Sequence, residues 1–248
     1  MAVEWKKAVV KKKTVWAEGL FTLTLDVPGV KPFEPGQFLQ VGVADGDNHI
    51  HRPYSVGSPH GRELDFYIVL VEEGELTPRL WAMNEGSELD VSERAAGSFT
   101  LSKTPEAKHL WLIATGTGLA PYIAMLRTEQ PWQRFEKIIV VHGVRLYSDL
   151  GYMEELRGYE ENGKNQMKYI PILTREDREG ILRGRIPACL DDGSLERAAG
   201  CQLSAADSAV LLCGNPQMLD DMEAKLGERN MRRHRRKEPG QIVLERYW

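Results

Sequence analysis

The chain has 248 residues, longer than a common single domain of about 100 to 200 residues, so two packed domains are the first expectation. Hydrophobic residues make up 42% and charged residues 27%, a balance that fills a core and excludes a long disordered tract. The apolar runs fall far short of the roughly 20 residues that cross a bilayer, and the lysine-rich N-terminal segment lacks the apolar stretch of a secretory signal. The sequence therefore predicts a globular cytoplasmic protein that does not enter a membrane.

The first hundred residues predict short antiparallel strands. Apolar and polar residues alternate with period two over 21–27 and through Leu39, Val41 and Val43, and a third run at 64–71 is similar. Glycine and proline separate these runs, as turns between antiparallel strands require. We interpret this part of the chain as a small antiparallel β-barrel.

The periodicity changes near residue 103, and a polar stretch there precedes continuous apolar runs that alternate with helical patterns. Strands are predicted at 110–114, 138–142, 169–173, 209–213 and 241–244, and helices at 121–128, 149–161 and 216–228. Asn215 before Pro216 fits a helix N-cap followed by proline at the first helical position. The alternation predicts an α/β domain with a doubly wound parallel sheet, so we divide the chain into residues 1–103 and 104–248.

Two segments could carry chemistry. Residues 114–121, which contain Gly116-Thr117-Gly118, follow an apolar strand directly and open a helix, the setting in which backbone N–H groups bind a pyrophosphate. The third glycine of the usual dinucleotide fingerprint is missing, so a structural turn stays an alternative. Arg52-Pro53-Tyr54-Ser55, predicted between strands of the barrel, offers a cation for a phosphate, a ring that stacks and a hydroxyl.

These two segments, together with Cys213-Gly214-Asn215-Pro216 and the aromatic C-terminal pair, occur in the order typical of one family. Over essentially its whole length the sequence resembles the ferredoxin-NADP reductases, bacterial ferredoxin/flavodoxin type. The resemblance implies an FAD-binding barrel, an NADP-binding parallel sheet, and electron transfer between NADPH and ferredoxin or flavodoxin through FAD. FAD and NADP(H) are accordingly the expected cofactors, and no metal is expected.

The resemblance also implies which residues bind FAD. Arg52 would bind the pyrophosphate, Tyr54 would pack against the flavin, and Ser55 would bond near its N5 atom. Trp248 would stack on the adenine with Tyr247 beside the flavin, although a final strand tucked into the core is the alternative. The other FAD residues implied are Pro53, Tyr67, Ile68, Val69, Glu75, Leu76, Thr77 and Thr115.

For NADP, the resemblance implies that three arginines hold the 2′-phosphate, because planar guanidinium groups suit a doubly charged phosphate better than they suit a ribose hydroxyl. They are Arg145, Arg175 and Arg185, and the other implied NADP residues are Thr117, Gly118, Val144, Thr174 and Asn215. An isolated arginine would more often be a solvated surface residue. Ser55, Cys213 and Glu245 match family residues around the hydride-transfer site, with a small buried core residue as the alternative for Cys213.

Residues 229–237 form a basic segment on a chain whose net charge is -4. The segment is either a solvated helix end or a docking patch for an acidic electron carrier, and without aromatic residues it does not predict nucleic-acid binding. By resemblance the protein is expected to be a monomer. Three other possibilities stay open: an NAD(P)H-dependent flavoprotein reductase serving an oxygenase or cytochrome, a non-catalytic flavin electron-transfer subunit, and a flavin-free protein that keeps only the fold.

Overall fold

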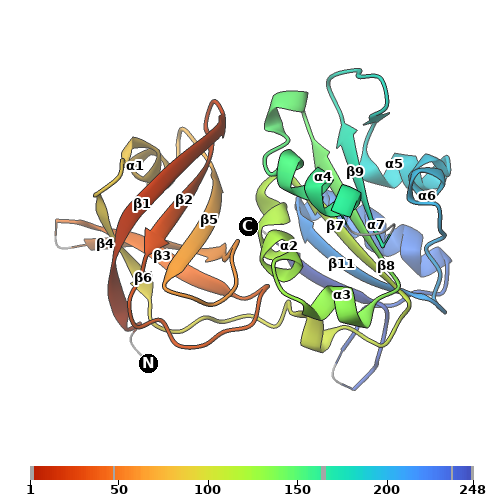
Figure 1. Ribbon diagram of the computed structural model, residues 1–248, viewed down its shortest axis with the longest axis horizontal. Coiled ribbons are helices and arrows are strands. Elements are labelled where there is room, and N and C mark those ends of the chain that lie inside the picture. The colour runs from red at the N-terminus through yellow and green to blue at the C-terminus, as the bar shows by residue number, and fades with distance from the viewer. Residues whose placement is uncertain (1–2, 47, 163–165, 236, 247–248) are drawn as a thin grey trace. The chain divides into compact units, whose positions relative to one another are not determined.

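The computed structural model describes residues 3–46, 48–162, 166–235 and 237–246, and their contacts divide the chain into two compact units (Figure 1). One unit contains the described residues up to Thr100 together with Ala120–Thr128. The other contains Leu101–Leu119 and the described residues from Glu129 onward. Each unit is built around one six-stranded sheet.

The first unit is an antiparallel barrel-like sheet with strand order β4-β3-β6-β1-β2-β5. Its strands are β1 (Trp5–Ala17), β2 (Leu20–Asp26), β3 (Phe38–Asp45), β4 (Asn48–Ser55), β5 (Glu63–Val69) and β6 (Glu88–Ser92), with the short helix α1 (Thr77–Ala82). Alternate residues such as Phe21, Leu23 and Leu25 on β2 are fully buried and join one apolar core. The predicted antiparallel barrel is thereby confirmed.

The predicted position of residues 52–55 between strands is wrong, because these residues form the end of β4. β4 is an edge strand, where Pro53 lies opposite Gln40 of β3. A proline is tolerated on an edge because its missing N–H group leaves no ladder partner unsatisfied. The proline and the polar neighbours hid this strand from a search for alternating apolar residues.

The second unit is a parallel sheet with strand order β10-β9-β8-β7-β11-β12. Its strands are β7 (His109–Thr115), β8 (Lys137–Val144), β9 (Met167–Leu173), β10 (Leu182–Arg183), β11 (Ser208–Gly214) and β12 (Ile242–Arg246). All five neighbouring pairs run parallel, which confirms the predicted α/β domain. The two-residue strand β10 was not predicted, since it is too short to show a period.

Helices cover both faces of the parallel sheet. The helices of the second unit are α3 (Gln130–Arg134), α4 (Met153–Asn162), α5 (Ile186–Asp191), α6 (Ser194–Ala199) and α7 (Pro216–Glu228). Apolar residues of α5, α6 and α7 pack on one face of the strands, and α4 lies over the other (Figure 1). The side chain of Asn215 accepts from the N–H groups of Gln217 and Met218 at 2.9 and 3.3 Å, so the predicted N-cap of α7 is confirmed.

The helix predicted over 149–161 begins later, at Met153. A short 3₁₀ turn, η3 (Tyr147–Asp149), precedes it, and the Asp149 carboxylate accepts the N–H of Leu146 at 3.0 Å. Tyr152 then adopts a left-handed conformation with φ 62°, which interrupts the helical path. The short helices α3, α5 and α6 were not predicted, because five or six residues show too little of a 3.6-residue period.

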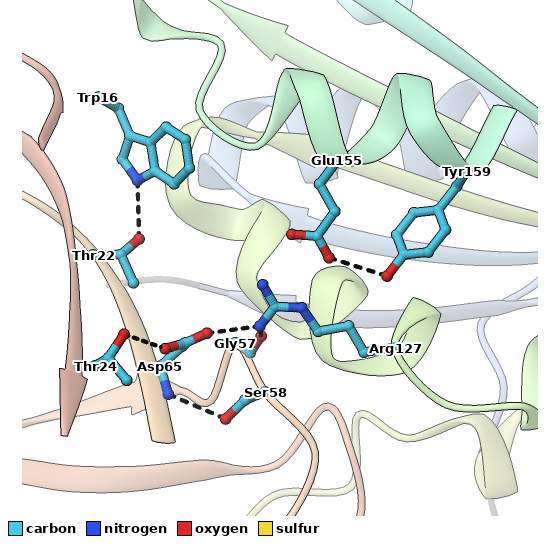
Figure 2. Close-up of polar contacts among 9 residues, drawn as sticks. All are labelled: Trp16, Thr22, Thr24, Gly57, Ser58, Asp65, Arg127, Glu155 and Tyr159. Carbon is cyan, nitrogen blue, oxygen red and sulfur yellow. Dashed lines mark hydrogen bonds and ion pairs between the residues drawn. The ribbon is translucent and has the colours of Figure 1, made fainter. Parts of the chain in front are cut away.

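The helix that follows the Gly116–Gly118 loop, α2 (Ala120–Leu126), belongs to the first unit by its contacts. Figure 2 shows one reason: Nη1 of Arg127, just after α2, donates to a carboxylate oxygen of Asp65 on β5 at 2.6 Å and to the carbonyl of Gly57 at 3.1 Å. The other oxygen of Asp65 accepts from Thr24 on β2 at 2.7 Å. Both side chains of the ion pair are largely buried, so screening by salt is weak.

The segment around residue 103 belongs to the second unit, where the Arg134 guanidinium holds it. Its nitrogens donate to three main-chain carbonyls of this segment, those of Leu101, Thr104 and Pro105.

Among the described residues, no helix is long and apolar enough to span a membrane.

Candidate nucleotide-binding sites

The parallel sheet reverses its winding direction between β7 and β11. From β7 the chain builds β8, β9 and β10 on one side and then returns to place β11 and β12 on the other. Ligands of such sheets bind beyond the carboxyl ends of the strands at this point. The residues that follow β7 and β11 there are Gly116–Leu119, which form the 3₁₀ turn η2, and Asn215. The segment singled out for its two glycines therefore lies at the ligand-binding edge.

The loops after β7 and β11 touch through main-chain atoms, and glycines make this contact possible. A Cβ atom at Gly118 would lie 2.6 Å from the Cys213 carbonyl oxygen, and one at Gly214 would lie 2.2 Å from Oγ1 of Thr115. Side-chain carbons do not approach other heavy atoms this closely, so both positions require glycine. Oγ1 of Thr115 also accepts the N–H of Asn215 at 2.8 Å. The paired loops therefore expose main chain rather than side chains, and main-chain N–H groups are the donors that bind a phosphate.

Three exposed arginines follow the neighbouring strands at the same edge: Arg145 after β8, Arg175 after β9 and Arg185 after β10. Main-chain hydrogen bonds of 3.0 Å, from Arg175 N to Arg145 O and from Thr174 N to Val144 O, keep the first two loops together. Nearby Arg178 and Arg183 form ion pairs with Glu176 and Asp177. Among the described residues, the first three arginines form no ion pair, so their charges are available to a ligand.

Sequence reasoning missed a small cluster at this edge, formed by Tyr147, Glu176 and Arg178. The Glu176 carboxylate accepts the N–H of Tyr147 at 2.8 Å and pairs with Nε of Arg178 at 3.0 Å. These two contacts, the hydrogen bond from Tyr147 first, lower the pKa of Glu176. The Arg178 guanidinium lies 3.9 Å from the centroid of the Tyr147 ring. No local pattern predicts this cluster, because its members come from two different strand ends.

In the antiparallel unit, β4 presents Arg52 at the surface. Its guanidinium donates to the carbonyl of His51 at 2.8 Å and lies 3.3 Å from the Glu75 carboxylate. More than half of each side chain of this ion pair is exposed, so the pair contributes little stability and is easily exchanged for a phosphate. Tyr54 is half-buried, and burial raises its pKa to about 12, so its hydroxyl stays protonated. Ser55 is buried at the end of the strand.

The other residues implied for FAD differ in what they expose. Tyr67 and Ile68 of β5 are buried, whereas Val69 is exposed. The side chains of Ile68 and Leu76 belong to the barrel core, so these two residues can meet a ligand through their main chain alone. The Thr77 hydroxyl accepts the N–H of Val71 at 2.9 Å and donates to its carbonyl at 3.1 Å, which closes the loop. Its proton is therefore already engaged.

The structure brings Cys213 and Glu245 together but carries Ser55 in the other unit. Cys213 on β11 and Glu245 on β12 are direct neighbours in the register of the parallel sheet. Cys213 is fully buried, and Glu245 is half-buried. Tyr247 and Trp248, implied for FAD stacking, lie outside the described residues.

Arg145, Arg175 and Arg185 form what we call the arginine edge of the parallel sheet. This edge and the paired glycine loops define a nucleotide-binding domain, and the antiparallel barrel is a second domain. Comparison with known proteins agrees, since residues 112–224 match the family described as Oxidoreductase NAD-binding domain.

Relatives then identify the particular family. The chain is 38% identical over 247 residues to a flavodoxin/ferredoxin-NADP reductase of Shigella flexneri, with 99% of each chain covered. It is 33% identical to a ferredoxin-NADP reductase of Pseudomonas aeruginosa, with 93% of each covered. The structure of a ferredoxin NADP+ reductase from Neisseria gonorrhoeae with bound FAD and NADP matches with a TM-score of 0.94 and 26% identity over the full length of both chains. This chain belongs to the flavodoxin/ferredoxin-NADP reductase family.

Proposed function

We propose that the protein is an FAD-containing reductase that exchanges electrons between NADPH and ferredoxin or flavodoxin. The observation that carries the choice of NADPH is the set of exposed arginines at the carboxyl edge of the parallel sheet. They are Arg145, Arg175 and Arg185. Among the described residues these arginines form no ion pair, and they lie beside glycine loops that leave main chain accessible. Planar guanidinium groups bind a 2′-phosphate through two hydrogen bonds. NADPH carries this phosphate and NADH does not.

The barrel offers groups that fit FAD. Arg52, whose weak ion pair with Glu75 can be exchanged, would hold the pyrophosphate. Tyr54, kept neutral by burial, would pack against the flavin, and Ser55 would hydrogen-bond near it. When bound, FAD would supply the exchange between hydride transfer and single-electron transfer. The remaining proposed contacts come from Pro53, Tyr67, Ile68, Val69, Glu75, Leu76, Thr77, Thr115, Tyr247 and Trp248.

For the nucleotide, Gly118 and Thr117 would present main chain to the pyrophosphate, with Asn215 opposite them across the paired loops. Val144 and Thr174, joined by their main-chain hydrogen bond, would line the base of the arginine edge. Among the proposed catalytic residues, Glu245 would carry protons and Ser55 would orient the flavin. Cys213 would shape the site from its buried position between two strands.

The basic segment 229–237 would steer an acidic electron carrier, but its arginines are not equivalent. Arg229 forms two bonds with the Glu196 carboxylate, at 2.7 and 3.2 Å, so its charge is already compensated. Arg232, Arg233 and Arg235 are exposed. Arg232 and Arg233 lie beside Ile242, the first residue of β12, at the opposite end of the sheet from the nucleotide loops, and the main chain of Arg235 pairs with Glu238. That placement suits long-range attraction rather than the electron-transfer contact. We also propose that the protein is a monomer, that it lies in the cytoplasm, and that it does not bind nucleic acid.

Anaerobic stopped-flow absorbance tests the function. The purified protein, expected to be yellow, is mixed with NADPH and separately with NADH. Rapid bleaching with a strong NADPH preference, followed by reoxidation when oxidised ferredoxin or flavodoxin is added, is the expected result. Reduction by NADH as fast as by NADPH would instead indicate a reductase serving an oxygenase or cytochrome. A protein that neither nucleotide reduces would be a flavin module of another function.

A further inference from the structure

His142 is a buried histidine beneath the nucleotide loops. It lies on β8 with 0% exposure, next to Val141 and Gly143, which are also buried. Its Nε2 atom lies 3.0 Å from the carbonyl oxygen of Gly116. Since a carbonyl can only accept, Nε2 carries the proton and donates this bond. Burial, the larger effect, lowers the pKa of His142 to about 4, so the ring is neutral at physiological pH.

The Gly116 carbonyl determines where the next N–H group points. Gly116 has a φ of 53°, in the left-handed region that glycine favours, so its own main chain is permissive. The peptide bond between Gly116 and Thr117 is planar and trans, which places its C=O and N–H on opposite sides. A carbonyl held toward His142 therefore turns the Thr117 N–H away from the ring. The histidine thus adds a side-chain bond that fixes the orientation of the first peptide of the 3₁₀ turn η2.

The rest of this loop is braced from both neighbouring strands. On the β11 side, Thr115 accepts the N–H of Asn215 at 2.8 Å. On the β8 side, Thr115 lies opposite Gly143 in the register of the parallel sheet. The His142 bond adds the brace at the glycine itself, where no side chain can be used.

A buried imidazole is an expensive way to fill this space. Within the described residues, Nδ1 of His142 has no hydrogen-bond partner, and burying such a polar atom costs free energy. An apolar side chain of similar size would avoid that cost. The residue is therefore best explained by the bond that Nε2 makes.

We propose that His142 is a positioning residue for nucleotide binding, whose Nε2–H bond to the Gly116 carbonyl presents the Thr117 N–H to the pyrophosphate of NADP(H). This inference rests on the proposed function.

Calorimetric titration of the FAD-containing protein with NADP+ and with adenosine 2′-monophosphate tests it. The second ligand carries the 2′-phosphate but no pyrophosphate. His142→Phe keeps the ring volume and removes the donor, and we expect it to raise the Kd for NADP+ about 10-fold while leaving the Kd for adenosine 2′-monophosphate within about twofold. His142→Gln places an amide N–H the same number of bonds from Cβ, and should restore the Kd for NADP+ to within about threefold.

Val140→Ala is the matched control, since Val140 is fully buried on the same face of β8 and has no polar group. This variant should lower the free energy of unfolding, and it should change the Kd for NADP+ no more than the Kd for adenosine 2′-monophosphate. If His142→Phe does not fold, His142→Leu takes its place. An unchanged Kd for NADP+ in the apolar variant, equal weakening of both ligands, or a Gln variant as weak as Phe would overturn the inference alone. A wild-type protein that does not bind NADP+ would overturn the proposed function with it.

Discussion

The two arginine-rich regions of the parallel sheet lie at its opposite ends and differ in how their charges are used. At the carboxyl end, Arg145, Arg175 and Arg185 are far apart in sequence but follow three adjacent strands. At the amino end, the basic segment 229–237 is dense in sequence. Its first arginine is bound to Glu196, and the main chain of residues 232–234 lies against the start of β12.

The difference shows that charge density along the chain does not mark the site. The dispersed arginines converge on loops where glycines leave no room for side chains and main chain is presented. The dense segment also lies against a glycine, Gly240, but at the amino end of β12, away from the carboxyl ends of the strands where ligands bind. Convergence at a strand edge, with accessible main chain beside it, is what makes positive charge useful for recognising a nucleotide.

The largest effect is expected from filling the contact between the glycine loops. Gly214→Ala should lower the free energy of unfolding by about 3 kcal/mol or more and weaken NADP+ binding about 100-fold, because its Cβ would collide with Thr115 and its φ is 127°. Urea unfolding and calorimetry measure the two effects. Gly227→Ala, in helix α7 with nothing near its Cβ, should instead raise stability by up to about 1 kcal/mol. Tolerance of Gly214→Ala would show that the loops do not need this contact.

The buried histidine under the same edge should make stability depend on pH. Above pH 6.5, His142 is neutral in both the folded and the unfolded chain. As pH falls from 6.5 toward 4, His142 becomes protonated in the unfolded chain but stays neutral in the folded protein. The free energy of unfolding therefore decreases, by up to about 3 kcal/mol. Urea unfolding of the wild type and of His142→Gln across this pH range measures the contribution of His142 to the free energy of unfolding. Parallel curves would mean that the buried ring does not resist protonation.

An intermediate effect is expected at the arginine edge. Arg145→Ala and Arg175→Ala should each raise the Kd for NADPH about 10-fold and leave the Kd for NADH nearly unchanged, since the lost partner is the 2′-phosphate. Arg183→Ala is the control, because Asp177 already compensates its charge at the same edge, and it should change the Kd by less than about twofold. Equal losses for all three variants would remove the distinction between paired and available arginines.

The smallest effect is expected at the amino end. Replacing Arg232, Arg233 and Arg235 by Gln should slow electron delivery to ferredoxin or flavodoxin about threefold at low salt and have no effect at high salt, while flavin reduction by NADPH is unchanged. Stopped-flow kinetics separates the two steps. Arg229→Gln should lower stability by about 1 kcal/mol without changing the salt dependence, since its partner is Glu196. Equal loss of both steps in the triple variant would reject a steering role.

Long periodic segments were predictable because their local pattern reports burial directly. The apolar run of β7 and the capped helix α7 with its Asn215-Pro216 start illustrate this. Elements that depend on their neighbours were missed. β4 carries a proline that only an edge position tolerates, and β10 has two residues that only pairing with β9 makes a strand.

The sequence by itself determined the two-domain organisation, the glycine loop after an apolar strand, and two arginines, Arg145 and Arg175, that follow predicted strands, because each of these features depends on local composition and order. Tertiary structure alone decided which groups meet. It placed Gly214 against Thr115, bound Arg229 to Glu196 and brought His142 under the Gly116 carbonyl. Those contacts join residues distant in sequence, and their distances are set by strand order and register, which no local pattern encodes.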